Sequence, residues 1–293
     1  MTFNDDARLD ASRVRRGGRG GTGIAVGGGA ALVLFLLSQL LGVDLTGLAP
    51  TTGEPVEQGT DTSLAEECRT GADANENVDC RMVGAYNSLD DYWATAFPRL
   101  GGQYVSPGMY LESGQWQTGC GTASSAMGPF YCPPDQSIYL DTAFFDVLTS
   151  QLGAEGGPLA EMYVIAHEWG HHVQNLSGTM DRLDRSETGP TSDGVRLELQ
   201  ADCFAGAWAQ NAQGTEDAAG VTLLEEFTQA QLASAMDAAA AVGDDHIQSS
   251  QGGRVNPEQW THGSSEQRQR WFWQGYTDGP SACDTFGVPG GDL

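Results

Sequence analysis

The sequence contains no lysine: all 14 of its basic residues are arginines, against 39 aspartates and glutamates, which gives a net charge of −25. Without a lysine, a phosphate-binding loop of the Gly-Lys-Ser/Thr type is excluded. A chain this acidic is repelled by phosphate backbones, which excludes nucleic acid as a partner. The sequence also lacks a Cys-x-x-Cys pair, so a cysteine-based zinc site is not expected.

Ionisable side chains are missing between Arg19 and Asp44. Within this gap Ile24–Val43 is rich in Ala, Val and Leu, and about 20 such residues cross the ~30 Å hydrocarbon core of a membrane. We therefore expect one transmembrane helix over residues 22–43. Residues 1–21 are rich in arginine and glycine, with five arginines against three aspartates, which favours a cytoplasmic tail and an extracytoplasmic body. A cleaved signal peptide is the alternative, and it exports the same body.

The remainder of the chain divides near residue 67. Residues 44–66 mix Thr, Gly, Pro and acidic residues with little apolar content, which is typical of a flexible linker. Residues 67–293 are long enough to bury a core, and we expect them to form one extracytoplasmic domain. The acidity of this part favours a cationic substrate, unless it serves only solubility.

Six cysteines follow the apolar segment, and an even number in an exported domain indicates disulfides. Two pairs share a spacing of twelve residues, which favours Cys68–Cys80 and Cys120–Cys132 and leaves Cys203 for Cys283. Sequence alone permits 15 pairings of six cysteines, so other connectivities stay open.

Spacing of apolar residues predicts an α+β domain that is mainly helical with a small β-sheet. Helical spacing covers Asn87–Phe97 and an alanine-rich segment over Leu223–Val242, whereas Ser137–Asp141 has the composition of a strand. Ser264 and Gln267 form a capping-box pattern that predicts the start of a further helix.

The segment Pro158–Gly178 predicts a helix that contains the pattern His-Glu-x-x-His. His167 and His171 are four residues apart, so on a helix both imidazoles reach one zinc ion. Glu168 flanks the same side and is the candidate general base for the water that zinc activates. The alternative is that both histidines are hydrogen-bonded core residues. His172 points about 100° away from His171 and is not expected to bind metal.

A catalytic zinc site needs a third protein ligand. Glu198 and Asp202 again lie four residues apart in a segment with helical spacing, which makes Glu198 the candidate ligand. Asp202 is then placed to accept a hydrogen bond from a liganding histidine and so to orient it. The alternative is that both are solvated surface acids. Glu187 and Asp193 are weaker candidates, because they lie in a turn-rich connector.

Several stretches of the chain resemble the bacterial family of membrane-anchored neutral zinc metallopeptidases. These stretches are RVRRGGRGG, CGTASSAMGPFYCPPDQSIYLD, YVIAHEWGHHVQNLSG, LELQADCFAGAWA and THGSSEQRQRWFWQGY. The resemblance implies a zincin-like fold with a zinc site of two histidines and one glutamate. His167, Glu168 and His171 match the zinc helix of the family, and Glu198 and Asp202 match its downstream Glu-x-x-x-Asp.

These observations predict a zinc-dependent peptidase anchored to the cell membrane, whose substrate is a peptide or protein. His262 is a candidate donor to the oxyanion, and Tyr139 is a candidate for aligning a peptide by edge pairing. Structural roles for both residues stay open. Two other functions use the same residues: a non-catalytic surface module that binds a partner, and an amidase of cell-wall peptides.

Overall fold

The structure is a computed structural model that describes residues 2–17, 63–184, 186–250 and 252–293. The apolar segment Ile24–Val43 and nearly all of the expected linker lie outside these ranges. Among the described helices, none combines the length and the apolar character that a membrane crossing requires. The transmembrane helix therefore stays a prediction.

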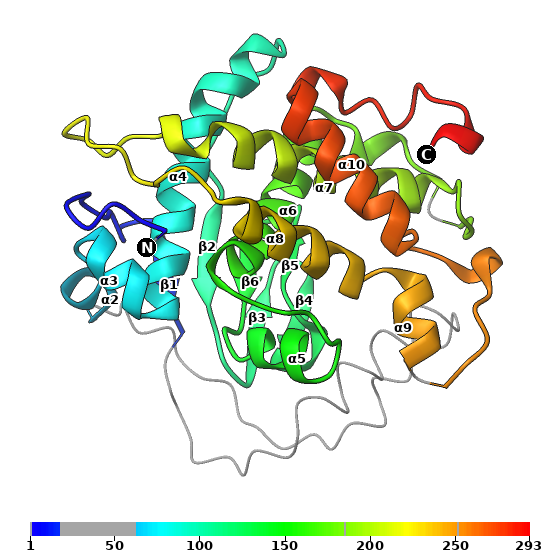
Figure 1. The fold of residues 1–293 in the computed structure, drawn as a ribbon, viewed down its shortest axis with the longest axis horizontal. Coiled ribbons are helices and arrows are strands. Elements are labelled where there is room, and N and C mark those ends of the chain that lie inside the picture. The colour runs from blue at the N-terminus through cyan, green and yellow to red at the C-terminus, as the bar shows by residue number, and fades with distance from the viewer. Residues whose placement is uncertain (1, 18–62, 185, 251) are drawn as a thin grey trace.

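Four helices form the centre of the body: α6 (Pro158–Leu176), α7 (Asp193–Asn211), α8 (Gln229–Ala241) and α10 (Ser265–Asp278). They lie against one another in Figure 1. The predicted zinc helix is α6, and it is buried on nearly every side, because helices pack on one face and strands on the other. The other α-helices of the described residues are α2 (Ser63–Glu67), α3 (Gly71–Glu76), α4 (Val78–Arg99), α5 (Phe144–Ser150) and α9 (Asp244–Ser250).

Helix starts follow the local sequence. The hydroxyl of Ser264 accepts from the backbone N–H of Gln267, so α10 begins at the predicted capping box. The alanine-rich helix α8 starts later than predicted, after a second capping box formed by Thr228 and Gln231. Residues 223–225 are not helical, because their backbone groups bond instead to residues 2–4 and to Thr215.

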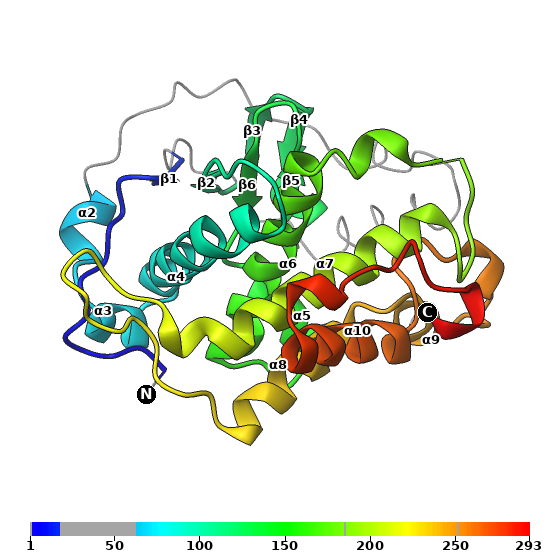
Figure 2. The ribbon, with the colours of Figure 1, turned by 90° about the horizontal axis from the view of Figure 1, so that it is seen from above.

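The main sheet has the order β1–β2–β6–β5 and lies on one side of α6 (Figure 2). β1 (Val14–Arg16), β2 (Gly108–Leu111) and β6 (Ser137–Leu140) are parallel, whereas β5 (Phe130–Cys132) runs antiparallel to β6. The predicted strand is therefore β6, an inner strand. A separate hairpin consists of β3 (Gln115–Thr118) and β4 (Gly121–Ser124).

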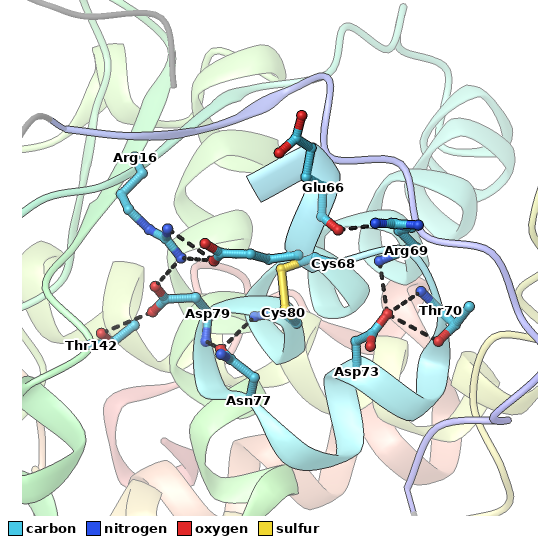
Figure 3. The surroundings of a disulfide bond; sticks show 11 residues. Arg16, Glu66, Cys68, Arg69, Thr70, Asp73, Asn77, Asp79, Cys80 and Thr142 are labelled. Carbon is cyan, nitrogen blue, oxygen red and sulfur yellow. Dashed lines mark hydrogen bonds and ion pairs between the residues drawn. A yellow bond between two sulfur atoms is a disulfide. The ribbon is translucent and has the colours of Figure 1, made fainter. Parts of the chain in front are cut away.

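Three disulfides join the cysteines in the predicted pairs: Cys68–Cys80, Cys120–Cys132 and Cys203–Cys283. The first joins the residue after α2 to the first turn of α4, across α3, within a group of ion pairs and hydrogen bonds (Figure 3). The third joins α7 to the segment that follows α10, which are 80 residues apart in sequence.

Residues 2–17 lie against the folded domain. They pack along α3 and α4, and their last residues form the edge strand β1 (Figure 1). Phe3 and Ala7 are buried in the same core as the central helices. The folded body therefore includes this N-terminal segment.

Glycines allow α7 and α10 to pack with their backbones in contact. A Cβ at Gly275 would lie 1.8 Å from the carbonyl oxygen of Cys203, and a Cβ at Gly206 would lie 1.9 Å from that of Phe272. Real Cβ atoms do not come so close to backbone, so larger residues would force the helices apart.

We expect Gly275→Ala to lower the free energy of unfolding by at least about 2 kcal/mol, because the added methyl group overlaps backbone that cannot rotate away. Chemical denaturation of the purified domain measures this. Gly214→Ala is the matched control, since a Cβ there meets nothing within 4 Å. Equal stability of the two variants would contradict the close helix contact.

Candidate metal centre

The site forms where α6 crosses α7. A Cβ at Gly170 would lie 2.8 Å from the Cα of Ala201, so the glycine inside the His-Glu-x-x-His pattern lets the two helices touch. Ala201 contributes only a methyl group to the contact. This close approach brings the histidines of α6 within reach of the acidic residues of α7.

His167, His171 and Glu198 converge at this crossing. The Nε2 atom of His167 lies 3.1 Å from one carboxylate oxygen of Glu198, and the Nε2 atom of His171 lies 3.5 Å from the other. All three ligand atoms fall within 4.8 Å of one another. Zinc bonds of about 2.0–2.1 Å in tetrahedral geometry separate neighbouring ligand atoms by about 3.3 Å. The three residues therefore fit one zinc ion with little movement.

Each histidine uses its other ring nitrogen for orientation. Nδ1 of His167 lies 2.8 Å from an oxygen of Asp202, as the sequence predicts. Nδ1 of His171 lies 2.8 Å from the side-chain oxygen of Gln174, which the sequence analysis did not identify. Both Nε2 atoms are thereby directed toward Glu198. Histidines that bind zinc in proteins usually use their second ring nitrogen for such a hydrogen bond.

Asp202 is fully buried, and a positively charged side chain lies beside it. The guanidinium of Arg268, on α10, donates to both of its carboxylate oxygens, at 2.8 and 3.0 Å. The hydroxyl of Tyr163 donates to the same carboxylate. A buried ion pair is tolerated when its remaining hydrogen-bonding capacity is satisfied, and this one is.

The charges of the site shift its pKa values in opposite directions. Burial lowers the pKa of His167, but Asp202 and Glu198 outweigh burial and raise it to about 10. Burial raises the pKa of Glu198, but the neighbouring His171 and His167 hold it well below its usual value. Glu198 is therefore a carboxylate at neutral pH, which is the form that binds a metal.

Glu168 lies beside the three ligands and lines the same cavity of about 340 Å³. Within the described part of the chain, no hydrogen bond or ion pair engages its carboxylate. Six side chains from α5, α6, α8, α9 and the residues that follow α5 and α8 form an apolar wall: Phe144, Leu152, Val164, Ala238, Val242 and Ile247. The cavity thus combines one unengaged carboxylate with a surface suited to an apolar group.

His262 lines this cavity as well. Its Nδ1 atom lies 3.3 Å from a carboxylate oxygen of Asp244, a buried residue that also accepts three backbone N–H groups. Burial lowers the pKa of His262, but Asp244 and Glu198 outweigh burial and raise it above its usual value. The ring is therefore held by one nitrogen, while Nε2 makes no hydrogen bond within the described residues.

Tyr139 has a packing role in the structure. Its ring stacks between those of Tyr110 and Phe130, and its hydroxyl donates to Asp135. Because β6 is paired on both sides, Tyr139 does not lie on an open strand edge. The edge next to the cavity belongs to β5.

The other candidates lie away from the metal ligands. His172 is buried between the hydroxyl of Tyr131 and the carbonyl of Val105, and burial lowers its pKa to about 4. Glu187 is exposed, and Asp193 accepts a hydrogen bond from the backbone of Asp184 at the start of α7. None of these three side chains joins the ligand group.

Comparison with known proteins agrees with the resemblance seen in the motifs. A family model described as "Putative neutral zinc metallopeptidase" matches residues 3–286. The chain belongs to this family. It is 51% identical over 255 residues, covering 85% of both chains, to the uncharacterised protein Rv2575 of Mycobacterium tuberculosis. It is 39% identical over 268 residues, covering 89% of this chain and 87% of the relative, to the uncharacterised protein YpfJ of Escherichia coli. No solved structure matches the chain.

We expect Arg268→Met to lower the free energy of unfolding by about 3–5 kcal/mol, because the charge of Asp202 then stays buried without its partner. Chemical denaturation in the presence of a chelator measures this effect apart from metal binding. Arg270→Met, an exposed arginine on the same helix, should leave stability nearly unchanged. If both variants unfold alike, the ion pair has no structural importance.

Proposed function

We propose that the protein is a zinc-dependent peptidase that hydrolyses peptide bonds by attack of water. The observation that carries this proposal is the convergence of His167, His171 and Glu198 beside Glu168, whose carboxylate is unengaged. The family description agrees with a zinc peptidase. When bound, zinc polarises the scissile carbonyl and lowers the pKa of water toward neutrality.

Glu168 acts as the general base in this proposal. Its position next to His167 on α6 and in the cavity lets it accept the proton of the attacking water and pass it to the leaving amine. His167, His171 and Glu198 hold the metal, and Asp202 fixes the ring of His167. The chemistry thus needs residues of two helices whose separation is set by Gly170.

The substrate lies along β5 in this proposal. One edge of β5 pairs with β6, and the other edge makes no strand pairing within the described residues. Phe130 and Tyr131 of β5 line the cavity, so an extended peptide added to this edge would pass the metal site. The apolar wall then receives an uncharged side chain next to the scissile bond.

We also propose that the body works outside the cytoplasm, attached to the cell membrane through Ile24–Val43. Three disulfides support an oxidising compartment. The net charge of −25 supports a preference for cationic peptides or proteins as substrates.

Glu168→Gln should lower the rate of peptide cleavage by about 10²–10⁴-fold, because the amide cannot accept the proton. A peptide library cleaved by the zinc-loaded protein gives the rate, and metal analysis should find one zinc in both proteins. If the variant retains the biological activity of the wild type, the protein is a surface module that binds a partner. Cleavage restricted to cell-wall peptides would identify an amidase.

His262→Ala should lower kcat by about 10²–10³-fold and change KM little, because an oxyanion donor acts only on the developing charge. Asp244 holds the ring of His262 through Nδ1, which leaves Nε2 for this donation. Steady-state kinetics on one cleaved peptide measures both constants. A change in KM alone would instead place His262 in substrate binding.

A further inference from the structure

A chain of buried amides leads from the second histidine to the C-terminal disulfide. The side-chain nitrogen of Gln174 donates to the carbonyl of Leu197 at 2.7 Å and to the side-chain oxygen of Gln200 at 3.2 Å. The side-chain nitrogen of Gln200 donates to the carbonyl of Cys283 at 2.7 Å. Gln174 is fully buried, and Gln200 is 9% exposed.

The backbone carbonyls of Leu197 and Cys283 fix the direction of these hydrogen bonds. Backbone carbonyls only accept, so Leu197 and Cys283 require the amide nitrogens of Gln174 and Gln200 to face them. The oxygen of Gln174 must then face His171, whose Nδ1 atom has to donate. This tautomer leaves the lone pair of Nε2 directed at Glu198 and the metal position.

The carbonyl at the far end is held by a covalent bond. Cys283 is joined to Cys203, which lies three residues after Gln200 on α7. Both cysteines are buried. His167 differs, because the buried ion pair of Asp202 and Arg268 orients it.

We propose that Gln174 and Gln200 are positioning residues for His171. The hydrogen-bonded chain from His171 through both glutamines to the carbonyl of Cys283 is called the relay, and the Cys203–Cys283 disulfide holds that carbonyl in place. The proposal rests on the proposed zinc site. It makes metal affinity depend on a disulfide whose sulfur atoms are not ligands.

Zinc affinity, measured by competition with a chromophoric chelator, tests the relay. Gln174→Met keeps the size of the side chain but removes its hydrogen bonds, and it should weaken zinc binding by about 10–100-fold and alter the visible spectrum of the cobalt-substituted protein. Gln200→Met should act in the same direction. The matched control is Gln248→Met, because Gln248 is a buried glutamine on α9 whose side chain bonds to the backbone of Asn256. Wild-type zinc affinity in Gln174→Met would overturn the proposal.

Removal of disulfides tests the role proposed for the Cys203–Cys283 disulfide. The double variant Cys203→Ala, Cys283→Ala should weaken zinc binding. The double variant Cys68→Ala, Cys80→Ala should not, because neither of these cysteines lines the cavity. Equal losses of zinc affinity in the two double variants would indicate general destabilisation and overturn the role proposed for the Cys203–Cys283 disulfide. A wild type that binds zinc but cleaves no peptide would refute the proposed function and leave the relay intact.

A second, independent observation concerns the N-terminal strap, residues 2–17. Two glycines of the domain, which have no side chain, leave room for the strap to approach closely. A Cβ at Gly84 would lie 2.4 Å from the ring of Phe3, and a Cβ at Gly71 would lie 1.9 Å from the carbonyl oxygen of Asn4. Both glycines have ordinary helical conformations, so close approach of the strap explains them.

Side chains of the domain also hold the backbone of the strap. Asn75 accepts from the N–H groups of Thr2 and Phe3 and donates to the carbonyl of Phe3, at 2.9–3.0 Å. Asn87 pairs in the same way with both backbone groups of Asp10, at 2.8 Å. These bonds recognise an extended backbone rather than particular side chains.

The end of the strap is bound by charge. Arg16 donates to Asp79 at 2.7 Å and to Glu67 at 3.1 Å, so one arginine of the cationic N-terminal region pairs with carboxylates of the domain (Figure 3). The family match begins at residue 3 and thus includes the strap. If the chain crossed a membrane once between residues 17 and 63, the strap and the domain would lie on opposite sides and these contacts could not form.

We infer that the strap stays docked in the working protein, so that residues 2–17 and the catalytic body lie on the same side of the membrane. This differs from the cytoplasmic tail that the arginines alone predict.

Labelling of the full chain in sealed cells tests the inference. All six native cysteines are in disulfides, so a membrane-impermeant maleimide reports only on introduced cysteines. Ser12→Cys in the strap and Ser150→Cys on the body are both exposed positions and should react with equal time courses. Reaction of Ser12→Cys only after detergent treatment would overturn the inference.

Thermal unfolding of the full chain in its membrane tests docking separately. Phe3→Ala should lower the midpoint by several degrees, because it empties a buried site. Asp6→Ala, at an exposed position of the strap, is the matched control and should not. An unchanged midpoint in Phe3→Ala would show that the strap is not docked.

Discussion

The contact between α6 and α7 at Gly170 is the constraint on which the candidate metal centre depends. The two helices touch there through a glycine and an alanine, and the same approach places Glu198 within 3.1–3.5 Å of both imidazoles. A larger residue at position 170 would push the carboxylate away from the histidines. The pattern His-Glu-x-x-His therefore contributes geometry through one of its variable positions as well as chemistry through its fixed ones.

Local spacing in the sequence predicted the parts of the site that lie on a single helix. His167 with His171, and Glu198 with Asp202, follow from the helical repeat. Two disulfides followed from a shared spacing of twelve residues, which left Cys203 for Cys283. The partners that complete the site come from other elements. Arg268 is 66 residues from Asp202, and Gln200 meets Gln174 across the helix crossing, so no local pattern marks either contact.

The fold departs from the sequence-based expectations where distant backbone segments pair. Leu224 has a helical neighbourhood in sequence, but it bridges to Phe3 in the structure, and α8 begins later as a result. Tyr139 was placed correctly in a strand, yet the parallel pairing with β2 made that strand an inner one. Such long-range pairings decide which residues face a substrate, and composition does not reveal them.

The position of Arg268 has a consequence for biosynthesis. A chain that emerges from its N-terminus presents α6 and α7 long before α10 exists, and until then the carboxylate of Asp202 has no cation beside it. If His167 binds zinc as we propose, the ion pair that orients this ligand forms only after α10 has packed against α7. The peptidase activity that we propose therefore depends on α10, and a chain that still lacks this helix does not have the complete site.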